Sequence, residues 1–258
     1  MIVEEVYAKS ILSRSKVLDY TVNPYIGCAH GCTYCYARFI KRFTKHQEPW
    51  GEFVDVKINA PTLLQHEIRK KKPGRVWISG LCDPYQPLEE KYGITRRCLE
   101  ILLKKGWPVT IQTKSALILR DLDLLKNHKN VEVTLTITTA NDEIRRIFEP
   151  KAPSIKERIE TLERLHSAGI KTCVMMAPLL PKAEGLIAEI IGKTDYVIVD
   201  KMNYHYADWV YKKYRLEYAI SEDFFRKKKW RWQMFPQMKE SPTSSYFNPN
   251  WRMFSFAS

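Results

Sequence analysis

The chain has 258 residues, of which 45% are hydrophobic, with seven Trp, fourteen Tyr and ten Phe. This composition excludes an intrinsically disordered chain, because such chains lack the apolar surface that folding must bury. Forty-two Lys and Arg against 29 Asp and Glu give a net charge of +13. The positive charge favours an anionic partner, with nucleic acid ahead of an acidic membrane. The alternative is the charge-rich surface of a thermophile's protein.

The N-terminal segment MIVEEVYAKSILSRSKVLDY lacks the long apolar run of a signal peptide, and no stretch of about 18 apolar residues occurs in the sequence. We therefore expect a cytoplasmic protein without a membrane segment. The six cysteines are expected to remain thiols in that reducing compartment. A tight cysteine cluster then indicates a metal site before a disulfide.

From residue 75 onwards, short β-rich runs alternate with longer amphipathic runs, a pattern typical of parallel strands joined by helices. In chain order we expect a strand at 18–23, a helix at 61–72, a strand at 75–81, a helix at 94–105, a strand at 108–115, a short helix at 119–127, a strand at 131–139, a helix at 154–169, a strand at 171–181, a helix at about 182–192 and a strand at 196–203. Ser154 and Glu157 have the spacing of a capping box, and Gly169 is suited to end that helix.

About six β/α units predict a partial (β/α)6 barrel of the TIM type, with a doubly wound open sheet as the alternative fold. In such a barrel the functional site lies at the carboxyl ends of the strands. The alternation stops near residue 204. We therefore expect a core domain at 1–203 and a helical, basic and aromatic extension at 204–258 that binds substrate or caps the barrel.

The segment NPYIGCAHGCTYCYAR (23–38) follows the first expected strand and holds Cys28, Cys32 and Cys35 in a C-x3-C-x2-C pattern on one short turn. Three thiolates at this spacing can bind a [4Fe-4S] cluster and leave one iron with an open coordination site. The amino and carboxylate groups of S-adenosylmethionine (SAM) can chelate that iron, and electron transfer then breaks the sulfonium C–S bond.

The alternative metal at the cysteine turn is zinc, with His30 or His46 as the fourth ligand. Zinc sites typically draw paired ligands from two separate knuckles, whereas this sequence has one. A disulfide is disfavoured by the expected compartment. We therefore expect an iron–sulfur cluster.

With an aromatic residue before its last cysteine, the C-x3-C-x2-C turn resembles the radical SAM superfamily. An ordered set of motifs over about residues 20–200 is similar to its spore-photoproduct-lyase-related branch, often labelled DNA repair photolyase. The motifs are NPYIGCAHGCTYCYAR (23–38), DPYQPLE (83–89), TRRCLEIL (95–102), TKSALILRDLDLL (113–125) and EPKAPSIKERIE (149–160). The resemblance implies a partial barrel, a [4Fe-4S] cluster and SAM as cofactors.

The resemblance also implies which side chains surround the cofactor. Tyr36 matches an aromatic residue that packs by SAM, and Tyr34 can line the same pocket or relay a radical; alternatively, both rings merely shield the cluster from water. Lys114 matches a lysine near the cofactor's carboxylate, and Thr136 matches a hydroxyl that reaches the same ligand, although threonine is also a good strand former. Ala177 ends the fifth unit, where a backbone edge can meet the adenine.

Cys82 and Asp83 follow the strand at 75–81, where a parallel barrel presents its reactive face. By resemblance, the position of Cys82 carries a small polar residue near the cofactor, and Asp83, which begins the DPYQP-like motif, is expected to contact the cofactor as well. The lyase itself places its hydrogen-donating cysteine two residues earlier, which matches Gly80 here. This difference argues against photoproduct repair itself. Cys82 can still donate a hydrogen atom, or it can simply pack in the core.

Glu149 and Arg158 match family positions, and we expect them to form a surface salt bridge or to support a helix. His66, His128 and His166 fall on expected helices, where they are ordinary surface or packed residues.

The segment FFRKKKWRW (224–232) contains five cations and four aromatic residues, and residues 201–258 carry eleven Lys and Arg against five Asp and Glu. Cations neutralise phosphate while exposed rings stack on unpaired bases, so the segment favours RNA or single-stranded DNA as a partner. The alternative is a helix that caps the open barrel with its lysines in solvent.

These observations predict an enzyme that cleaves SAM reductively to a 5′-deoxyadenosyl radical, which abstracts hydrogen from a nucleic acid, tRNA or DNA, in modification or repair. An electron donor such as ferredoxin or flavodoxin would reduce the cluster. A peptide or a small metabolite is the competing substrate. From another class of function, the chain could be a nucleic-acid-binding module whose metal loop is structural.

Overall fold

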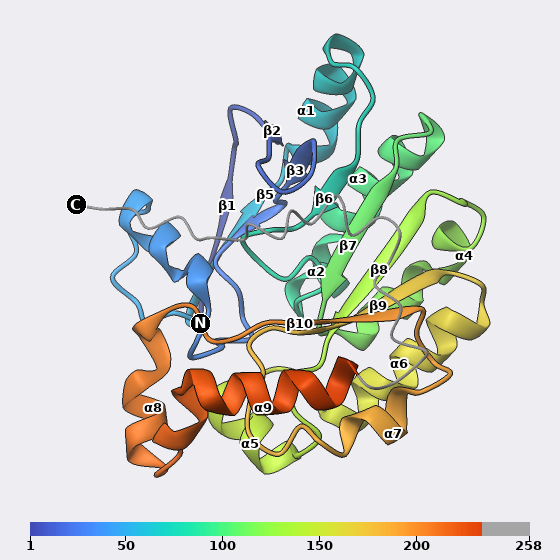
Figure 1. The fold of residues 1–258 in the computed structure, drawn as a ribbon. Helices are drawn as coiled ribbons and strands as arrows, with labels where there is room; N and C mark the ends of the chain where they lie inside the picture. Colours follow the sequence, from blue (N-terminus) through green and yellow to red (C-terminus); the bar gives the residue numbers. More distant parts are fainter. Residues whose placement is uncertain (234–258) are drawn as a thin grey trace.

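The structure, a computed structural model, describes residues 1–233, with the side chains of 229–233 excepted. Its centre is a seven-stranded sheet in the order β10-β9-β8-β7-β6-β3-β2 (Figure 1). The strands are β2 (Leu12–Arg14), β3 (Tyr20–Val22), β6 (Val76–Ile78), β7 (Val109–Thr113), β8 (Val131–Thr136), β9 (Lys171–Met176) and β10 (Tyr196–Val199). The strands from β3 to β10 are parallel, and β2 pairs antiparallel with β3.

The order of the parallel strands follows the sequence without a reversal. A doubly wound sheet requires such a reversal, so that alternative is wrong. Among the described residues the two edge strands, β2 and β10, do not pair with each other, and the barrel stays open. The expected partial barrel of six β/α units is confirmed.

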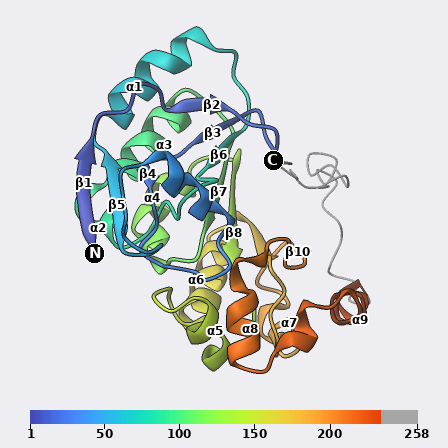
Figure 2. The ribbon, with the colours of Figure 1, turned by 90° about the vertical axis from the view of Figure 1, so that its left-hand side faces the viewer.

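A second sheet was not predicted and has three strands in the order β1-β5-β4. These strands are β1 (Ile2–Val6), β5 (Phe53–Lys57) and β4 (Tyr25–Ile26), and Figure 2 shows β1 and β5 side by side. The first strand of the chain is therefore β1 and not the one expected at 18–23. Four of the five residues of β1 are exposed, so its sequence carries no alternation of buried and polar residues that would reveal it.

Helices follow the strands along one side of the main sheet (Figure 1). They are α1 (Ala60–Glu67), η2 (Ile68–Lys70), α2 (Leu88–Tyr92), α3 (Ile94–Lys104), η3 (Ala116–Asp121), α4 (Leu122–Leu125), α5 (Asp142–Phe148), α6 (Ile155–Ser167) and α7 (Leu186–Ile190). The five-residue α2 and the seven-residue α5 were missed because they are too short to show helical periodicity. None of the helices described here combines the length and the hydrophobicity of a membrane span.

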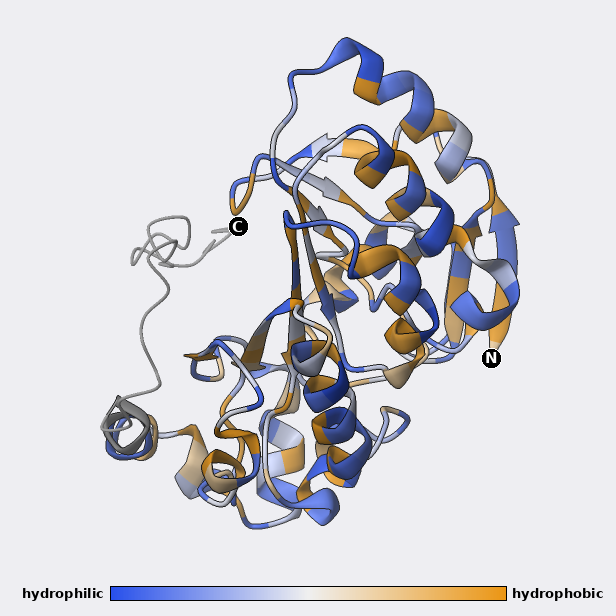
Figure 3. Cartoon of the chain, turned by 90° about the vertical axis from the view of Figure 1, so that its right-hand side faces the viewer, coloured by the Kyte–Doolittle hydropathy of each residue, from blue (hydrophilic) through white to orange (hydrophobic). Residues whose placement is uncertain are grey.

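Apolar residues concentrate on the central strands and on the inner faces of the helices, whereas the outer faces are hydrophilic (Figure 3). All six residues of β8 are buried. Strands of a parallel sheet are covered on both faces, which explains why they read as nearly continuous β-branched runs in the sequence. This two-sided core fixes the carboxyl ends of the strands in one rigid edge.

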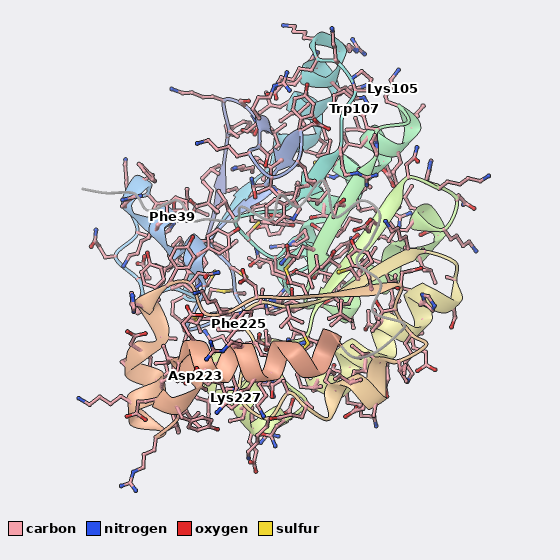
Figure 4. The ribbon with its side chains drawn as sticks, viewed as in Figure 1. Phe39, Lys105, Trp107, Asp223, Phe225 and Lys227 are labelled. Carbon is pink, nitrogen blue, oxygen red and sulfur yellow. The ribbon has the colours of Figure 1, made fainter. Side chains whose placement is uncertain are left out.

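The chain after β10 is helical and comprises η4 (His205–Ala207), α8 (Asp208–Lys213), η5 (Glu217–Ile220) and α9 (Glu222–Gln233). In Figure 4, Phe225 and Lys227 lie on opposite sides of α9, with Phe225 on the side nearer β10, and Lys227 is exposed. Phe224 and Phe225 pack against the hydrophobic core. Residues 234–258 of the expected extension, and the side chains of 229–232 in its basic segment, lie outside the described residues.

The capping box at the start of α6 is confirmed: the Ser154 side chain accepts a hydrogen bond from the Glu157 backbone, and the Glu157 side chain accepts one from the Ser154 backbone. Replacing Ser154 with Ala is expected to lower the free energy of unfolding by about 1 kcal/mol, because the backbone N–H of Glu157 loses its partner. Urea unfolding followed by circular dichroism measures this change. The control is Ser167→Ala at the exposed end of the same helix, and equal stability of the two variants would contradict the assignment.

Candidate active site

The candidate site lies at the carboxyl edge of the main sheet, where the residues that follow successive strands come together. Because β3, β6, β7, β8 and β9 are parallel neighbours, their ends meet at one edge. The predicted residues at this edge are the cysteine turn after β3, Cys82 and Asp83 after β6, Lys114 after β7, Thr136 at the end of β8 and Ala177 after β9.

The cysteine turn places three free thiols in the interior: Cys28 and Cys32 are buried and Cys35 is half-buried. The backbone N–H of Cys35 donates a hydrogen bond to the carbonyl of Cys32, at 3.2 Å. Gly27 has a φ of 83°, and a Cβ at this position would lie 2.4 Å from the carbonyl oxygen of Phe53. Glycine is therefore required for the turn to enter against β5.

Two distant motifs anchor the cysteine turn. The Gln86 side chain accepts a hydrogen bond from the backbone N–H of Ala29, at 2.8 Å. The backbone N–H of Thr33 donates to the carbonyl of Phe148, also at 2.8 Å. The turn is thus held by the DPYQP motif on one side and by the end of α5 on the other, contacts that the sequence analysis did not identify.

A buried ion pair between Glu149 and Arg158 supports the cysteine turn through Tyr34. Glu149 Oε2 lies 2.5 Å from Arg158 Nη2, and both side chains have no exposed surface. The hydroxyl groups of Tyr34 and Thr138 both donate to Glu149 Oε1. Burial raises the pKa of Glu149, but the charges of Arg158 and Lys114 outweigh it and bring the pKa to about 2.

The expectation of a surface salt bridge between Glu149 and Arg158 is wrong. Arg158 lies on the face of α6 that packs against the sheet, where its Nη1 donates to the carbonyl of Thr136 at 3.0 Å. A charged pair can be buried here because its polar atoms also bind the backbone and neighbouring hydroxyls. Sequence periodicity does not reveal these partners, since they lie on other elements.

Asp83 organises the ends of β6 and β7. Its Oδ1 accepts from the Thr113 hydroxyl at 2.6 Å, and its Oδ2 accepts from the Lys114 backbone N–H at 2.8 Å. The Nδ1 atom of His30, inside the cysteine turn, lies 3.3 Å from Asp83 Oδ2. Burial lowers the pKa of His30, but the charges of Asp83 and Cys28 outweigh it and raise the pKa to about 9.

His30 therefore links the cysteine turn to Asp83, a contact that the sequence did not predict. His46, the other histidine considered as a zinc ligand, lies with its Nε2 2.7 Å from Asp55 on β5. Asp83 was predicted to contact the cofactor. In the structure its carboxylate fixes backbone and histidine positions around the cysteine turn.

Cys82 lies beside the turn, with its Sγ 2.7 Å from the Ser79 hydroxyl. Burial is the main reason that its pKa rises to about 12. Tyr36 begins η1 (Tyr36–Phe43) directly after Cys35, and its hydroxyl donates to the carbonyl of Gly80. Tyr36 thus ties the exit of the cysteine turn to the loop that carries Cys82.

The remaining predicted residues, Lys114, Thr136 and Ala177, differ in their burial and in their contacts. Lys114 is half-buried; burial lowers its pKa, but Cys32 and Glu149 raise it by more. Its ammonium lies 5.8 Å from the centre of the Tyr34 ring. Thr136 is buried, with its hydroxyl 3.5 Å from the Gln112 amide. Ala177 is half-buried next to the strand end.

The chemistry of the thiols fits an iron–sulfur cluster. Burial is the main cause that raises the pKa of Cys32 to about 11 and that of Cys35 to about 12, and the charge of Cys32 raises the pKa of Cys35 further. Three thiolates can occupy this buried turn together only if a cationic group compensates them. The irons of a cluster would do so, and three cysteines leave one iron open for another ligand.

The chain matches one family profile and resembles several known proteins. A family profile described as the Radical SAM superfamily matches residues 22–185. An uncharacterized protein of Methanocaldococcus jannaschii is 35% identical over 74% of this chain and 72% of its own length. An uncharacterized protein of Acidianus two-tailed virus is 36% identical over 63% of this chain, and the match spans only 56% of the viral protein.

The fold is similar to that of spore photoproduct lyase complexed with a dinucleoside spore photoproduct, with a TM-score of 0.62 and 15% sequence identity. The superposition covers 83% of this chain and 66% of the lyase chain. A lyase variant with bound AdoMet and the dinucleoside aligns with a TM-score of 0.61. At such low identity, the likeness establishes a shared fold.

Replacing Cys32 with Ala is expected to abolish cluster binding and SAM cleavage, because two thiolates remain in the turn. Cys82→Ala is the matched control and should retain the iron. Iron and sulfide content after anaerobic reconstitution, together with formation of 5′-deoxyadenosine, measures both. Loss of iron from the Cys82 variant would refute the separation of Cys82 from the cluster ligands.

Replacing Glu149 with Gln is expected to destabilise the protein by about 3–5 kcal/mol, because the Arg158 charge would remain buried without its partner. Denaturant unfolding of the reconstituted protein measures the loss. Glu160→Gln on the exposed face of α6 provides the control. A change below about 1 kcal/mol for Glu149→Gln would show that the pair is dispensable.

Proposed function

Because this chain belongs to the radical SAM superfamily, and is therefore a radical SAM enzyme with a [4Fe-4S] cluster and SAM as cofactors, we propose that its substrate is a nucleic acid. The proposed reaction is hydrogen abstraction in the modification or repair of tRNA or DNA. The cofactors, when bound, supply a 5′-deoxyadenosyl radical by reductive cleavage of SAM. The protein's own residues hold these groups, orient the substrate and keep water away.

We propose that Cys28, Cys32 and Cys35 ligate the cluster. Lys114 follows β7 directly, and its half-buried ammonium interacts electrostatically with Cys32. It is therefore suited to pair with the cofactor's carboxylate. Ala177 would offer its backbone edge to the adenine, and the hydroxyl of Thr136 and the ring of Tyr36 would complete the pocket. Asp83 would contribute indirectly, since it fixes the backbone of Lys114.

Cys82 is the proposed hydrogen donor. Its raised pKa keeps the thiol protonated at neutral pH, and a thiol must carry its hydrogen in order to donate it. Tyr34 was considered as a radical relay or a wall of the pocket. The bond from its hydroxyl to Glu149 favours a structural role over a radical relay, because it holds Tyr34, and with it the turn between Cys32 and Cys35, in place.

A stack of tyrosines beside the cysteine turn carries the proposal of a nucleic-acid substrate. The rings of Tyr36 and Tyr204 lie 6.0 Å apart at an interplanar angle of 21°, and those of Tyr204 and Tyr206 lie 6.0 Å apart at 14°. Each of the three residues is 37% exposed. Arg38 lies 5.2 Å from the centre of the Tyr206 ring.

Exposed aromatic rings and guanidinium groups are the side chains on which unpaired bases stack, and neighbouring cations neutralise the phosphates. The stack begins one residue after Cys35, so a base held on it would lie near the cluster. Further cations flank it, at Lys41 and Arg42 of η1 and at Lys212 and Lys213 of α8. Together with the net charge of +13, these features favour a nucleic acid over a peptide or a small metabolite.

The reconstituted enzyme is expected to bind single-stranded DNA or tRNA, with an affinity that falls about tenfold or more between 50 and 200 mM salt, because phosphate contacts release counterions. Fluorescence anisotropy under anaerobic conditions measures the binding. The double variant Tyr204→Ala/Tyr206→Ala should bind at least about tenfold more weakly, since base stacking contributes about 1–3 kcal/mol per base. Tyr214→Ala, at the exposed end of α8, serves as the control.

Two results would contradict the proposal. One is an enzyme that forms 5′-deoxyadenosine but shows no salt-dependent binding to either nucleic acid, which would favour the peptide or metabolite substrate. The other is a protein that binds nucleic acid but, with a competent cluster and dithionite, forms no 5′-deoxyadenosine. That result would favour a binding module.

A further inference from the structure

A second group of metal-binding side chains lies on the three-stranded sheet. One ligand atom from each of Glu4, His46 and Asp55 lies within 4.8 Å of the other two. Glu4 is on β1, Asp55 is on β5, and His46 is in the segment between η1 and β5. We propose that these three residues form a site for a divalent transition-metal cation of the zinc class, separate from the cysteine turn and independent of the proposed function.

The register of the sheet brings the two carboxylates together. Glu4 and Asp55 are direct partners on the parallel strands β1 and β5, so their side chains leave the same face of the sheet. Like charges in directly opposite positions destabilise a sheet unless something compensates them. The imidazole of His46 lies against this pair, and a divalent cation between the three groups would neutralise both carboxylates.

The imidazole is held in the orientation that a metal ligand requires. Its Nε2 lies 2.7 Å from Asp55 Oδ1, and its Nδ1 lies 3.1 Å from Glu48 Oε2. The ring also stacks on Phe53, with the ring centres 4.3 Å apart. Histidines that bind metals commonly donate their second N–H to a carboxylate, which fixes the tautomer and leaves the other nitrogen for the metal. Glu48 is in that position here.

The site has one open side. Asp55 and His46 are buried, whereas Glu4 is exposed. A cation can therefore enter past Glu4 and reach the two buried side chains, whose mutual hydrogen bond it would replace. On binding, it replaces the proton that Nε2 shares with Asp55, and this proton is released to solvent. One imidazole with two carboxylates suits zinc, with a water completing the coordination.

Such a site would brace the cysteine turn. Phe53, on which His46 stacks, adjoins Gly27 at the start of the turn. In the same segment as His46, Gly51 packs so tightly against the turn that a Cβ on Gly51 would lie 2.6 Å from the Cα of Gly31. A cation that ties this segment to β1 and β5 would limit its movement over the cluster.

The test uses the cluster-loaded enzyme, titrated anaerobically with ZnCl2 by calorimetry and analysed for bound zinc. The expected result is one zinc per chain, with binding at least about tenfold weaker in His46→Gln and in Asp55→Asn, because each variant removes a ligand. Glu4→Gln changes only an exposed ligand and guards against misfolding of the other variants; it should also weaken binding. Glu160→Gln is the control and should bind as the unmodified enzyme does.

Zinc X-ray absorption separates this site from adventitious binding to cysteines. Ligation by the proposed residues gives Zn–N and Zn–O distances of about 2.0–2.2 Å, whereas thiolate ligation gives about 2.3 Å. The proposal is overturned if the enzyme binds no zinc, if the bound zinc has sulfur ligands, or if none of the three ligand variants weakens binding. In those cases His46 acts only as a charged link between Asp55 and Glu48.

Discussion

The buried ion pair between Glu149 and Arg158 is the interaction on which the candidate site depends. Its hydrogen bonds join four parts of the chain: α6, the end of β8, the segment after α5 and the cysteine turn. A buried carboxylate is tolerated where its charge is paired and polar groups bind it. The turn must therefore present the Tyr34 hydroxyl to Glu149, and this requirement sets where Cys32 and Cys35 lie.

The parallel sheet supplies the second constraint. A sheet covered on both faces is rigid, and every strand ends at the same edge, so residues far apart in sequence converge there. Asp83 uses this edge to connect His30 of the turn with the start of the loop after β7. The same groups that hold the turn leave Lys114 half-buried beside it, as a cation next to the proposed position of the cofactor.

The chain beyond the barrel contributes to the site through aromatic contacts. Tyr204 and Tyr206 continue a stack that begins at Tyr36, so the segment after β10 lies directly against the residues that follow the third cysteine. The residues proposed to bind the substrate would then lie next to the residues proposed to hold the cluster. The proposed zinc site on β1 and β5 would support the start of the turn, because His46 stacks on Phe53 and Phe53 adjoins Gly27.

Features that depend on local spacing could be predicted from the sequence alone. Periodicity located the six parallel strands and most of the longer helices, Ser154 and Glu157 marked the start of α6, and the cysteine spacing indicated a cluster with one open iron. The identity of the buried polar residues and of the groups that they bind became clear from the three-dimensional structure. Tyr34 and Glu149 are 115 positions apart, and the strand β1 and the stack on Tyr204 likewise depend on distant partners. Helical or strand periodicity reports which face a residue occupies, but not the group that will meet it across the fold.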